Sequence, residues 1–463
     1  MRIRSIFPIL ATLMFTACSD SAEPATPDAE GGAGGHGSAS QAPGDATESA
    51  QPTASNAASA TPTPTAKTTP RPVDAASAKL AKTFASSSNA FGYDFWRTLA
   101  PSSKGNVAVS PASLSIALSM AYGGAVGDTA TEMAKVLHVT GTPASDVTNG
   151  AGALDSQLTD GSRAVKIEIA NKLFGERTYA FEDPFLDATK KAYGAGLEPV
   201  DFKKHPDAAR GTINAWVEAQ TNKRITNLIP PGAIKPDTRL VLTNAIHFLG
   251  DWAHPFEQRM TYDAPFSTTK TERANVATMH QVGSFGFVAK DGVKVVSMPY
   301  AGGATSMLVV LPDAVDGVGA LESSLDPKKV DAWIAAMKPT ELQLAMPKFE
   351  IDPPEPIEAG AMLQTLGIRT AFTEHADFTE IAHPSNPAER LKISEVFHKA
   401  FVKVDEKGTE AAAATAIVDV EAGAADVPHG VAVDVDHPFL FLMRDDATGA
   451  ILFMGRVANP SAK

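Results

Sequence analysis

The sequence is almost without cysteine: Cys18 is the only one in 463 residues, so no disulfide can form within the chain. It also contains no Gly-x-Ser-x-Gly nucleophile motif, no His-Glu-x-x-His zinc motif, no Gly-x-x-x-x-Gly-Lys-Ser/Thr phosphate loop and no Cys/His cluster. Together these absences disfavour an enzyme that acts through a serine nucleophile, a zinc ion or a bound nucleotide. We therefore predict no catalytic residue, no metal and no cofactor.

Positive charge is also in short supply, with 40 Lys and Arg residues against 53 Asp and Glu, a formal net charge of −13. An acidic protein of this kind is repelled by nucleic acid, and the charge serves solubility. The eleven histidines are scattered along the chain and form no ligand group.

The N-terminus has the pattern of an export signal. Arg2 and Arg4 precede a mostly apolar stretch from Ser5 to Thr16, which is shorter than the ~20 residues that a membrane-spanning helix needs. The small residues before Cys18 resemble a bacterial lipoprotein signal, in which this cysteine becomes the lipidated first residue, although Phe15 stands where that signal usually has leucine. Residues 1–18 are therefore interpreted as a signal peptide, and we expect an exported protein that is lipid-anchored at the bacterial cell envelope or surface, or released outside the cell.

From Ser19 to Ala78 the sequence lacks Ile, Leu, Met and aromatic residues, and Val73 is its only large aliphatic residue. Such a composition cannot bury enough surface to fold, so residues 19–77 are interpreted as a disordered tether rich in Ala, Pro, Ser, Thr and Gly. A flexible coil of this length spans about 40 to 50 Å.

Residues 78–463 are interpreted as one folded domain. Apolar residues at helical spacing predict helices from Leu80 to Leu99 and from Ser113 to Tyr122, and Thr129 to Glu132 has the spacing of a capping box that opens another helix. An extended segment is expected around 165–174. Later β-rich stretches are expected at 240–248, 295–298, 306–311, 342–349, 399–405, 439–443 and 451–457. Helices first and strands later indicate an α+β protein.

Several short motifs, in one order over residues 78 to 463, resemble those of serpins, the serine protease inhibitor family. They are Asn106 to Ser113 followed by Ala117 to Met120, Ala170 to Phe174, Ile213 to Val217, Thr243 to Phe248, Trp252, Met298 to Tyr300, Ser306 to Pro312, Met346 to Phe349, Ala376 to Phe378, Glu406 to Glu410, His437 to Phe441 and Leu452 to Arg456.

The resemblance implies three β-sheets, eight or nine helices and an exposed reactive-centre loop. It also implies that a serine protease cleaves this loop, becomes covalently attached to it, and is trapped when the loop inserts as a strand into the central sheet. By family spacing, the bond cut joins Ala422 and Gly423. The loop hinge comprises Glu406, Gly408, Thr409, Glu410, Ala411, Ala412, Ala413, Ala414 and Thr415. A sheet-opening cluster comprises Ser110, Ser113, Asn244 and His398, with Trp252 at the upper opening. We expect a monomer whose covalent partner is the protease.

The composition of the loop suits insertion. Side chains alternate between the two faces of a strand, so Thr409, Ala411 and Ala413 would share the inward face, where small residues slide between separating strands. No proline lies between Glu406 and Val427 to remove a ladder donor. Gly408 is expected to be a pivot, because glycine can adopt positive φ.

A small residue at the cleaved bond favours elastase-like or subtilisin-like proteases. The length of the return segment also permits cleavage at Glu421, Ala424 or Ala425, and more remotely at Asp426. No Arg, Lys or Phe occurs between Ala411 and His437, which disfavours trypsin-like and chymotrypsin-like proteases. The alternative function is that of a noninhibitory binding or carrier protein with the same fold at the cell surface.

Asp419 is the first charged residue on the inward face and would lie near the far end of an inserted strand. Burying an unpaired carboxylate costs several kcal/mol, so we expect Asp419→Ala to raise the thermal stability of the cleaved form. Calorimetry of the two cleaved proteins measures this, and equal melting temperatures would show that residue 419 remains in water.

Overall fold

The computed structural model describes residues 74–194, 196–386, 389–410 and 430–462. Its helices are α1 Ala75–Leu99, α2 Pro111–Tyr122, α3 Gly127–Val136, α4 Ala144–Leu158, α5 Asp183–Tyr193, α6 Pro206–Gln220, α7 Val318–Ser324, α8 Pro327–Ala336 and α9 Ala359–Leu366, with short 3-10 helices η1 Gln258–Met260 and η2 Thr370–Phe372. Its strands are β1 Val107–Val109, β2 Lys166–Glu176, β3 Glu198–Val200, β4 Leu240–Asp251, β5 Thr261–Ser267, β6 Arg273–Lys290, β7 Val293–Pro299, β8 Thr305–Pro312, β9 Lys338–Pro347, β10 Phe349–Ile351, β11 Ile357–Glu358, β12 Ile393–Val404, β13 Gly408–Thr409, β14 Val431–Asp434, β15 Phe439–Asp445 and β16 Ile451–Val457.

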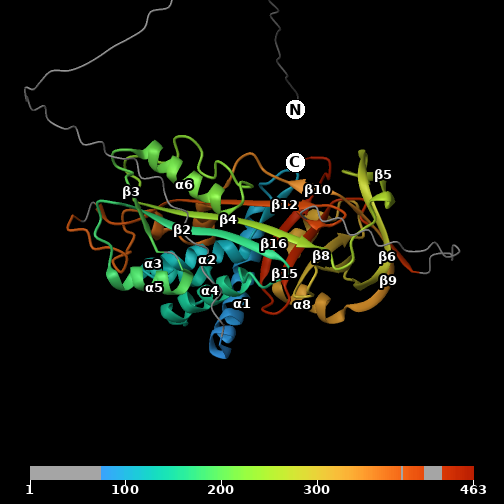
Figure 1. The fold of residues 1–463 in the computed structure, drawn as a ribbon, viewed down its shortest axis with the longest axis horizontal. Coiled ribbons are helices and arrows are strands. Elements are labelled where there is room, and N and C mark those ends of the chain that lie inside the picture. The colour runs from blue at the N-terminus through green and yellow to red at the C-terminus, as the bar shows by residue number, and fades with distance from the viewer. Residues whose placement is uncertain (1–73, 195, 387–388, 411–429, 463) are drawn as a thin grey trace, which may run out of the picture. The chain divides into compact units, whose positions relative to one another are not determined.

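A seven-stranded sheet forms the centre of the fold, in the order β10-β12-β13-β4-β2-β3, with β11 paired to β12. Helices α1 to α5 lie on one face of this sheet and α6 lies on the other (Figure 1). Side chains alternate along β4, so that Leu242 and Ile246 pack in the main core while Val241 and Ala245 pack in a separate core that includes α6. The central strands are therefore buried on both faces.

The remaining nine strands form a continuous network in the order β1-β16-β15-β8-β7-β6-β9-β14, with β5 paired to β6. Strand β6 is 18 residues long; residues 273–279 pair with β5, 278–287 with β9 and 286–290 with β7. Two of the three expected sheets are thus joined through β6 by unbroken hydrogen bonding.

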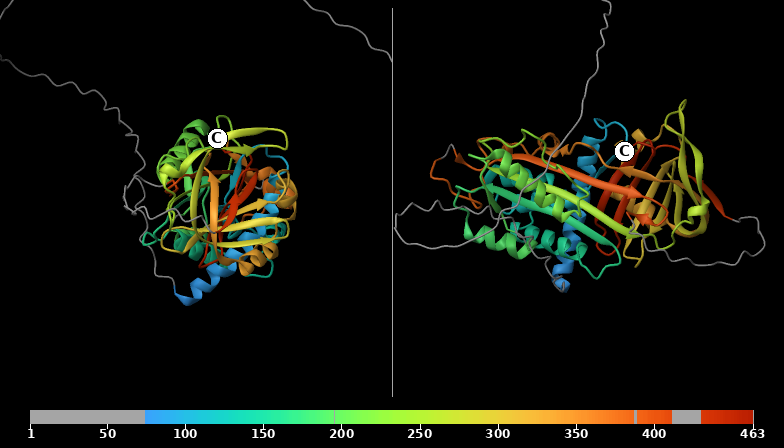
Figure 2. Two further views of the ribbon diagram at one scale, coloured as in Figure 1. Left: turned by 90° about the vertical axis from the view of Figure 1, so that its right-hand side faces the viewer. Right: turned by 45° about the horizontal axis from the view of Figure 1, so that its top comes forward.

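Strands β4 and β12 lie side by side and run parallel, although the intervening chain exceeds 140 residues (Figure 2). Their register runs from Ile393 opposite Leu240 to Phe401 opposite His247. Along this length the two strands hydrogen-bond directly to each other, and β13 lies between them only at one end.

The helices predicted at 80–99 and 113–122 correspond to α1 and α2, and the extended segment at 165–174 corresponds to β2. The seven β-rich stretches correspond to β4, β7, β8, β9, β12, β15 and β16. The predicted capping box is wrong. Helix α3 begins at Gly127 with no side-chain cap, and Glu132 instead accepts hydrogen bonds from the backbone amides of Arg369 and Thr370, both at 2.7 Å. The carboxylate therefore joins two distant segments rather than closing its own helix. In the described residues, no helix is long and apolar enough to cross a membrane.

Candidate functional site

The hinge begins with a tight turn between β12 and β13. The amide of Asp405 donates to the carbonyl of Gly408 at 2.9 Å, so the chain reverses over residues 405–408. Trp252 holds this turn through its backbone amide, which donates to Lys407 O at 2.7 Å, and its indole Nε1, which donates to Asp405 O at 3.0 Å. Its ring stacks on that of buried Tyr300, with centroids 4.5 Å apart. The direction of the chain is thus fixed before it reaches the sheet.

Strand β13 lies between β12 and β4 and is antiparallel to both. Thr409 is opposite Val404 on one side and Gly250 on the other, and Gly408 is opposite Asp251. The Thr409 side chain is 1% exposed and faces the main core, where its hydroxyl hydrogen-bonds to the Tyr300 hydroxyl at 2.6 Å. The two residues of β13 therefore already occupy the first positions of a strand between β4 and β12.

The role expected for Gly408 needs correction. Its φ is not positive; the positive φ at the hinge belongs to Glu410, at 49°. A Cβ on Gly408 would collide with the Gly250 carbonyl. Glycine is therefore required at residue 408 because two backbones approach closely, and the chain changes direction two residues later.

Glu410 is anchored on the opposite face of the sheet from Thr409. Its carboxylate is 7% exposed and pairs with His247 of β4 and with Arg224, which follows α6. The other ring nitrogen of His247 lies 3.3 Å from Glu168 of β2, so this histidine lies between two carboxylates. Its ring also packs edge-on against Phe401 of β12. Because its backbone N–H also donates to Lys403 O of β12 at 2.9 Å, Glu410 is bound to both β4 and β12.

The charge state of His247 follows from these contacts. Burial by itself lowers its pKa, but hydrogen bonds and charges from Glu168 and Glu410 outweigh burial and raise the pKa above its ordinary value. A protonated imidazole donates to both carboxylates at once. Glu406, at the start of the turn, receives similar support: burial opposes its ionisation, but two hydrogen bonds from Lys348 Nζ, at 2.8 and 3.0 Å, help to bring its pKa below the ordinary value.

The structure brings Ser110, Ser113, Asn244 and His398 together in a fully buried cluster where β4 and β12 pair, with His398 directly opposite Asn244. The Ser110 amide donates to His398 Nε2 at 3.0 Å, which leaves Nδ1 to donate to Asn244 Oδ1. The Asn244 amide group then donates to Ser113 Oγ at 2.7 Å. Burial lowers the pKa of His398 to about 3, so this histidine is neutral.

Sequence reasoning missed one member of this cluster, Asn171 of β2. Its Oδ1 accepts from Ser113 Oγ at 3.0 Å and from Asn244 Nδ2 at 2.6 Å. The available signal was a carboxamide among the apolar side chains of one strand face, Ile167, Ile169 and Leu173. The cluster therefore joins α2 to β2, β4 and β12, and separation of β4 from β12 must disrupt hydrogen bonds within it. Trp252 is not part of the cluster and belongs to the hinge.

Other predicted site residues lie outside the described residues: Cys18, Ala411, Ala412, Ala413, Ala414, Thr415, Asp419, Ala422 and Gly423. Within the described ranges, no group of His, Cys, Asp and Glu could hold a metal ion.

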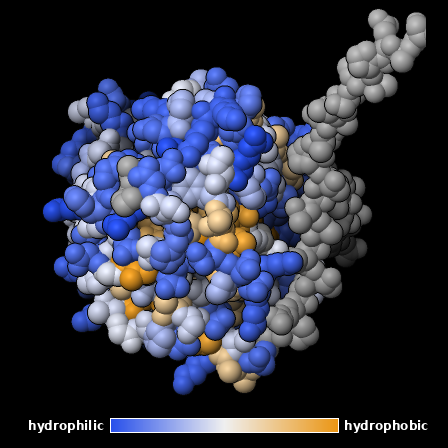
Figure 3. Space-filling model, turned by 90° about the vertical axis from the view of Figure 1, so that its left-hand side faces the viewer, coloured by the Kyte–Doolittle hydropathy of each residue, from blue (hydrophilic) through white to orange (hydrophobic). Residues whose placement is uncertain are grey.

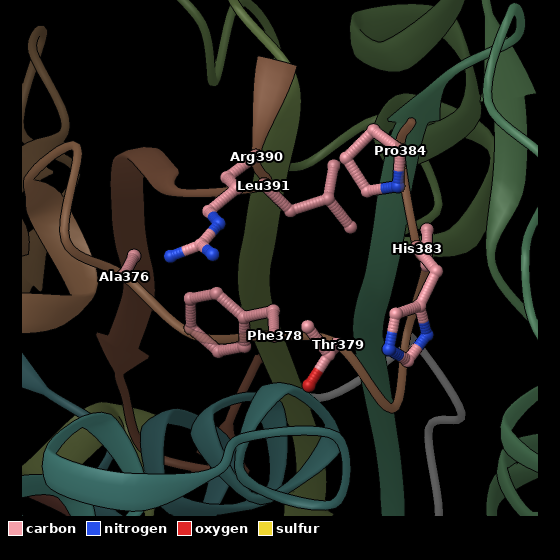
Figure 4. Close-up of a pocket in the computed structure, with 8 residues that line it drawn as sticks. Ala376, Phe378, Thr379, His383, Pro384, Arg390 and Leu391 are labelled. Carbon is pink, nitrogen blue, oxygen red and sulfur yellow. The ribbon is translucent and has the colours of Figure 1, made fainter. Parts of the chain in front are cut away.

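A cavity of about 100 Å³ lies in segment 376–391, lined by Phe378, Leu391 and Arg390 among others (Figure 4). The volume of this cavity is well below the ~300 Å³ at which pockets for small molecules begin.

Hydrophobic residues are visible in the middle of the left-hand face of the molecule, surrounded by hydrophilic ones (Figure 3).

The anchor at Glu410 predicts a pH dependence. Because the pKa of His247 is raised in the folded protein, its stabilising contribution is complete below its unfolded value of ~6.5 and is lost as pH rises through the folded value. In the uncleaved protein, amide exchange at Glu410, whose N–H donates to Lys403 O at 2.9 Å, should accelerate over this rise beyond the intrinsic effect of pH. His247→Gln should remove this acceleration, whereas His205→Gln, at an exposed histidine, should retain it. The same profile in all three proteins would contradict the role of His247.

Comparison with known proteins agrees with this geometry. The family described as Serpin (serine protease inhibitor) matches residues 86–460. The chain is 38% identical over 388 residues to human Serpin B4, covering 80% of this chain and 97% of the relative. It is 37% identical over 382 residues to the leukocyte elastase inhibitor of Sus scrofa, with the same coverage of 80% and 97%.

Among solved structures, human thyroxine-binding globulin superposes with a TM-score of 0.74 at 30% identity, covering 83% of this chain and all of that one. The expected α+β fold is thereby confirmed. The family match, the relatives and the fold lead to one conclusion: this chain belongs to the serpin family of serine protease inhibitors.

Proposed function

We propose that the protein is a suicide-substrate inhibitor of elastase-like or subtilisin-like serine proteases. The protease serine hydroxyl attacks the carbonyl carbon of Ala422, the bond to Gly423 breaks, and the new amino terminus at Gly423 leaves while an ester joins Ala422 to the enzyme. Insertion of the loop between β4 and β12 then carries the enzyme away before water can hydrolyse the ester. The observation that carries the proposal is β13, which already pairs with both strands.

Extending the register of β13 gives a specific path for the inserted strand. Each step along the loop moves one residue back along β4 and β12, because β13 is antiparallel to both. On the inward face, Ala411 and Ala413 then follow Thr409, and Thr415 comes opposite both Asn244 and His398. The Thr415 hydroxyl would thus lie between Asn244 and His398, the only position on the core-facing side where both neighbouring side chains are polar. There it can replace hydrogen bonds that β4 and β12 lose when they separate.

The free energy of insertion is sufficient for this role. The direct ladder between β4 and β12 is broken, but two new ladders form, a net gain of roughly ten hydrogen bonds at ~0.5 to 1.5 kcal/mol each. This gain is comparable with the whole stability of an ordinary domain, ~5 to 15 kcal/mol. The uncleaved protein must therefore be kept in its form by a kinetic barrier, to which the hinge turn and the polar cluster contribute.

The relatives support the choice of protease. One is named a leukocyte elastase inhibitor, and the small side chain at Ala422 fits the narrow primary pocket of such an enzyme. The second candidate function, a noninhibitory carrier, is favoured by the likeness to thyroxine-binding globulin. The small residues from Ala411 to Ala414 favour inhibition, because insertion needs them and carriage does not.

The test is incubation with a pancreatic elastase and a subtilisin, followed by denaturing gel electrophoresis and mass measurement of the released peptide. We expect a covalent complex and a peptide that begins at Gly423. Ala413→Arg places a charge on the inward face and should convert the protein into a substrate that is cut while the protease stays active. Val427→Arg adds the same charge beyond the cut and should leave inhibition intact. Cleavage without a complex in the unaltered protein would favour the carrier.

We further propose that Cys18 is lipidated and anchors the protein at the bacterial cell envelope or surface. The support is the sequence pattern before Cys18 and the composition of residues 19–77, which contain too few large hydrophobic residues to fold. A flexible segment of this kind would let the inhibitory domain extend away from the membrane.

Expression of the full chain in a bacterial host that processes lipoproteins, with labelled fatty acid, tests the anchor. The label should appear on the protein in the membrane fraction, and Cys18→Ser should abolish both the label and the membrane association. An unlabelled, membrane-free protein would exclude the anchor.

A further inference from the structure

Four large hydrophobic side chains are strongly exposed in the described residues, and each lies on or next to β5, β6 or β14 of the nine-stranded sheet. Met260 (44% exposed) immediately precedes β5, Tyr262 (55%) lies on β5, Val282 (53%) on β6 and Val431 (46%) on β14. Isolated exposed hydrophobic residues are normal, but a group of them indicates an interaction surface. Strands β5, β6 and β9 form the right-hand end of the molecule in Figure 1, and the left view of Figure 2 faces this end.

The register shows which of these side chains share a face. Val282 of β6, Gln343 of β9 and Ala432 of β14 are directly opposed, so all three project to the same side, and Ala432 is exposed. His280 is two residues before Val282 and shares its face. Its ring stacks on Tyr262, with centroids 4.0 Å apart and planes 8° apart.

A second contact holds the same pair in place. His280 Nδ1 donates to the backbone carbonyl of Met260 at 3.1 Å, so the imidazole ring is held by this hydrogen bond as well as by stacking on Tyr262. The Tyr262 ring is therefore held in position and still exposed. We call Tyr262, His280, Val282 and Ala432 the apolar face. A rigid tyrosine loses little conformational entropy on binding, which suits an interface anchor.

The apolar face lies beside the point where the reactive loop rejoins the fold. The chain returns at Gly430, and β14 begins at the next residue and pairs with β9. Ala422 is eight residues before Gly430, a reach of at most about 26 to 29 Å. A protease domain of about 230 residues has a radius of gyration of about 17 Å. An enzyme whose active site holds Ala422 is thus within reach of the apolar face.

We propose that the apolar face is a second contact surface for the serine protease that cleaves the loop, and that it selects among proteases of the same primary specificity. This inference rests on the proposed inhibitory function. The occupant is the protease, because the loop that the enzyme must bind ends on β14, one strand of this face. Contact here adds recognition that a small residue at the cleaved bond cannot provide.

The test compares the unaltered protein with the double variant Tyr262→Ser, Val282→Ser against a panel of elastase-like and subtilisin-like proteases. The probe is the enzyme that forms the covalent complex fastest with the unaltered protein. The double variant should form this complex about ten- to thirty-fold more slowly, as expected when a tyrosine anchor is lost, with the same number of inhibitor molecules consumed per enzyme. A synthetic peptide of residues 411–429 lacks the apolar face and serves as a control for the enzyme. Each protease preparation should cleave it at the same rate in every experiment.

Val431→Ser is the matched control, because Val431 is also exposed, at 46%, but projects from the other face: it is opposed to Leu342, which is in turn opposed to Gly283. It should leave the rate within about two-fold. An equal rate in the double variant, or an equal loss in Val431→Ser, would refute the apolar face as a protease contact. A dimer of the unaltered protein that the double variant converts to monomers would assign the face to a second copy instead. If the unaltered protein forms no complex with any protease, the proposed function fails and this inference fails with it.

Discussion

The structure depends on a direct pairing between β4 and β12, two parallel strands from distant parts of the chain. If these two parallel strands separate, one antiparallel strand fits between them and pairs with both. In the proposed function the reactive loop supplies this strand, and its first two residues already lie between β4 and β12 as β13. If the protein acts as proposed, the hinge contacts and the polar cluster influence when pairing between β4 and β12 is exchanged for pairing with the loop.

Two sets of contacts oppose this exchange, and they differ in kind. At the hinge, Glu410 is held by charge, through Arg224 and His247, and the turn is held by Trp252. Further along, Asn244 and His398 join β4 to β12 by neutral hydrogen bonds in a buried cluster. Charged contacts respond to pH and salt, whereas a neutral buried network changes little with either. The contribution of the hinge contacts to the barrier against strand exchange therefore depends on pH and salt. The contribution of the polar cluster to the same barrier does not.

The sequence was sufficient to predict α1 and α2, the long central strands β2, β4 and β12, and four of the five members of the polar cluster, because family motifs coincide with these buried elements. It could not reveal that Asn171 completes the cluster, since the role depends on a neighbouring strand. It gave the wrong reason for Gly408, because close approach to Gly250 is a tertiary contact that no local pattern encodes. Strands β5 and β6 were not predicted, because exposed residues interrupt the alternation of apolar residues that marks a strand.

In the proposed mechanism, the length of β4 limits the distance between the trapped protease and the inhibitor. In the register of β13, the loop residue opposite Leu240, where β4 begins, is Asp419. Only residues 420–422 then remain to connect the end of the sheet to the enzyme, and this segment spans about 10 Å when fully extended. This connecting segment is shorter than the radius of the captured enzyme. The enzyme would therefore be held in contact with the end of the inhibitor, and its active site would be distorted.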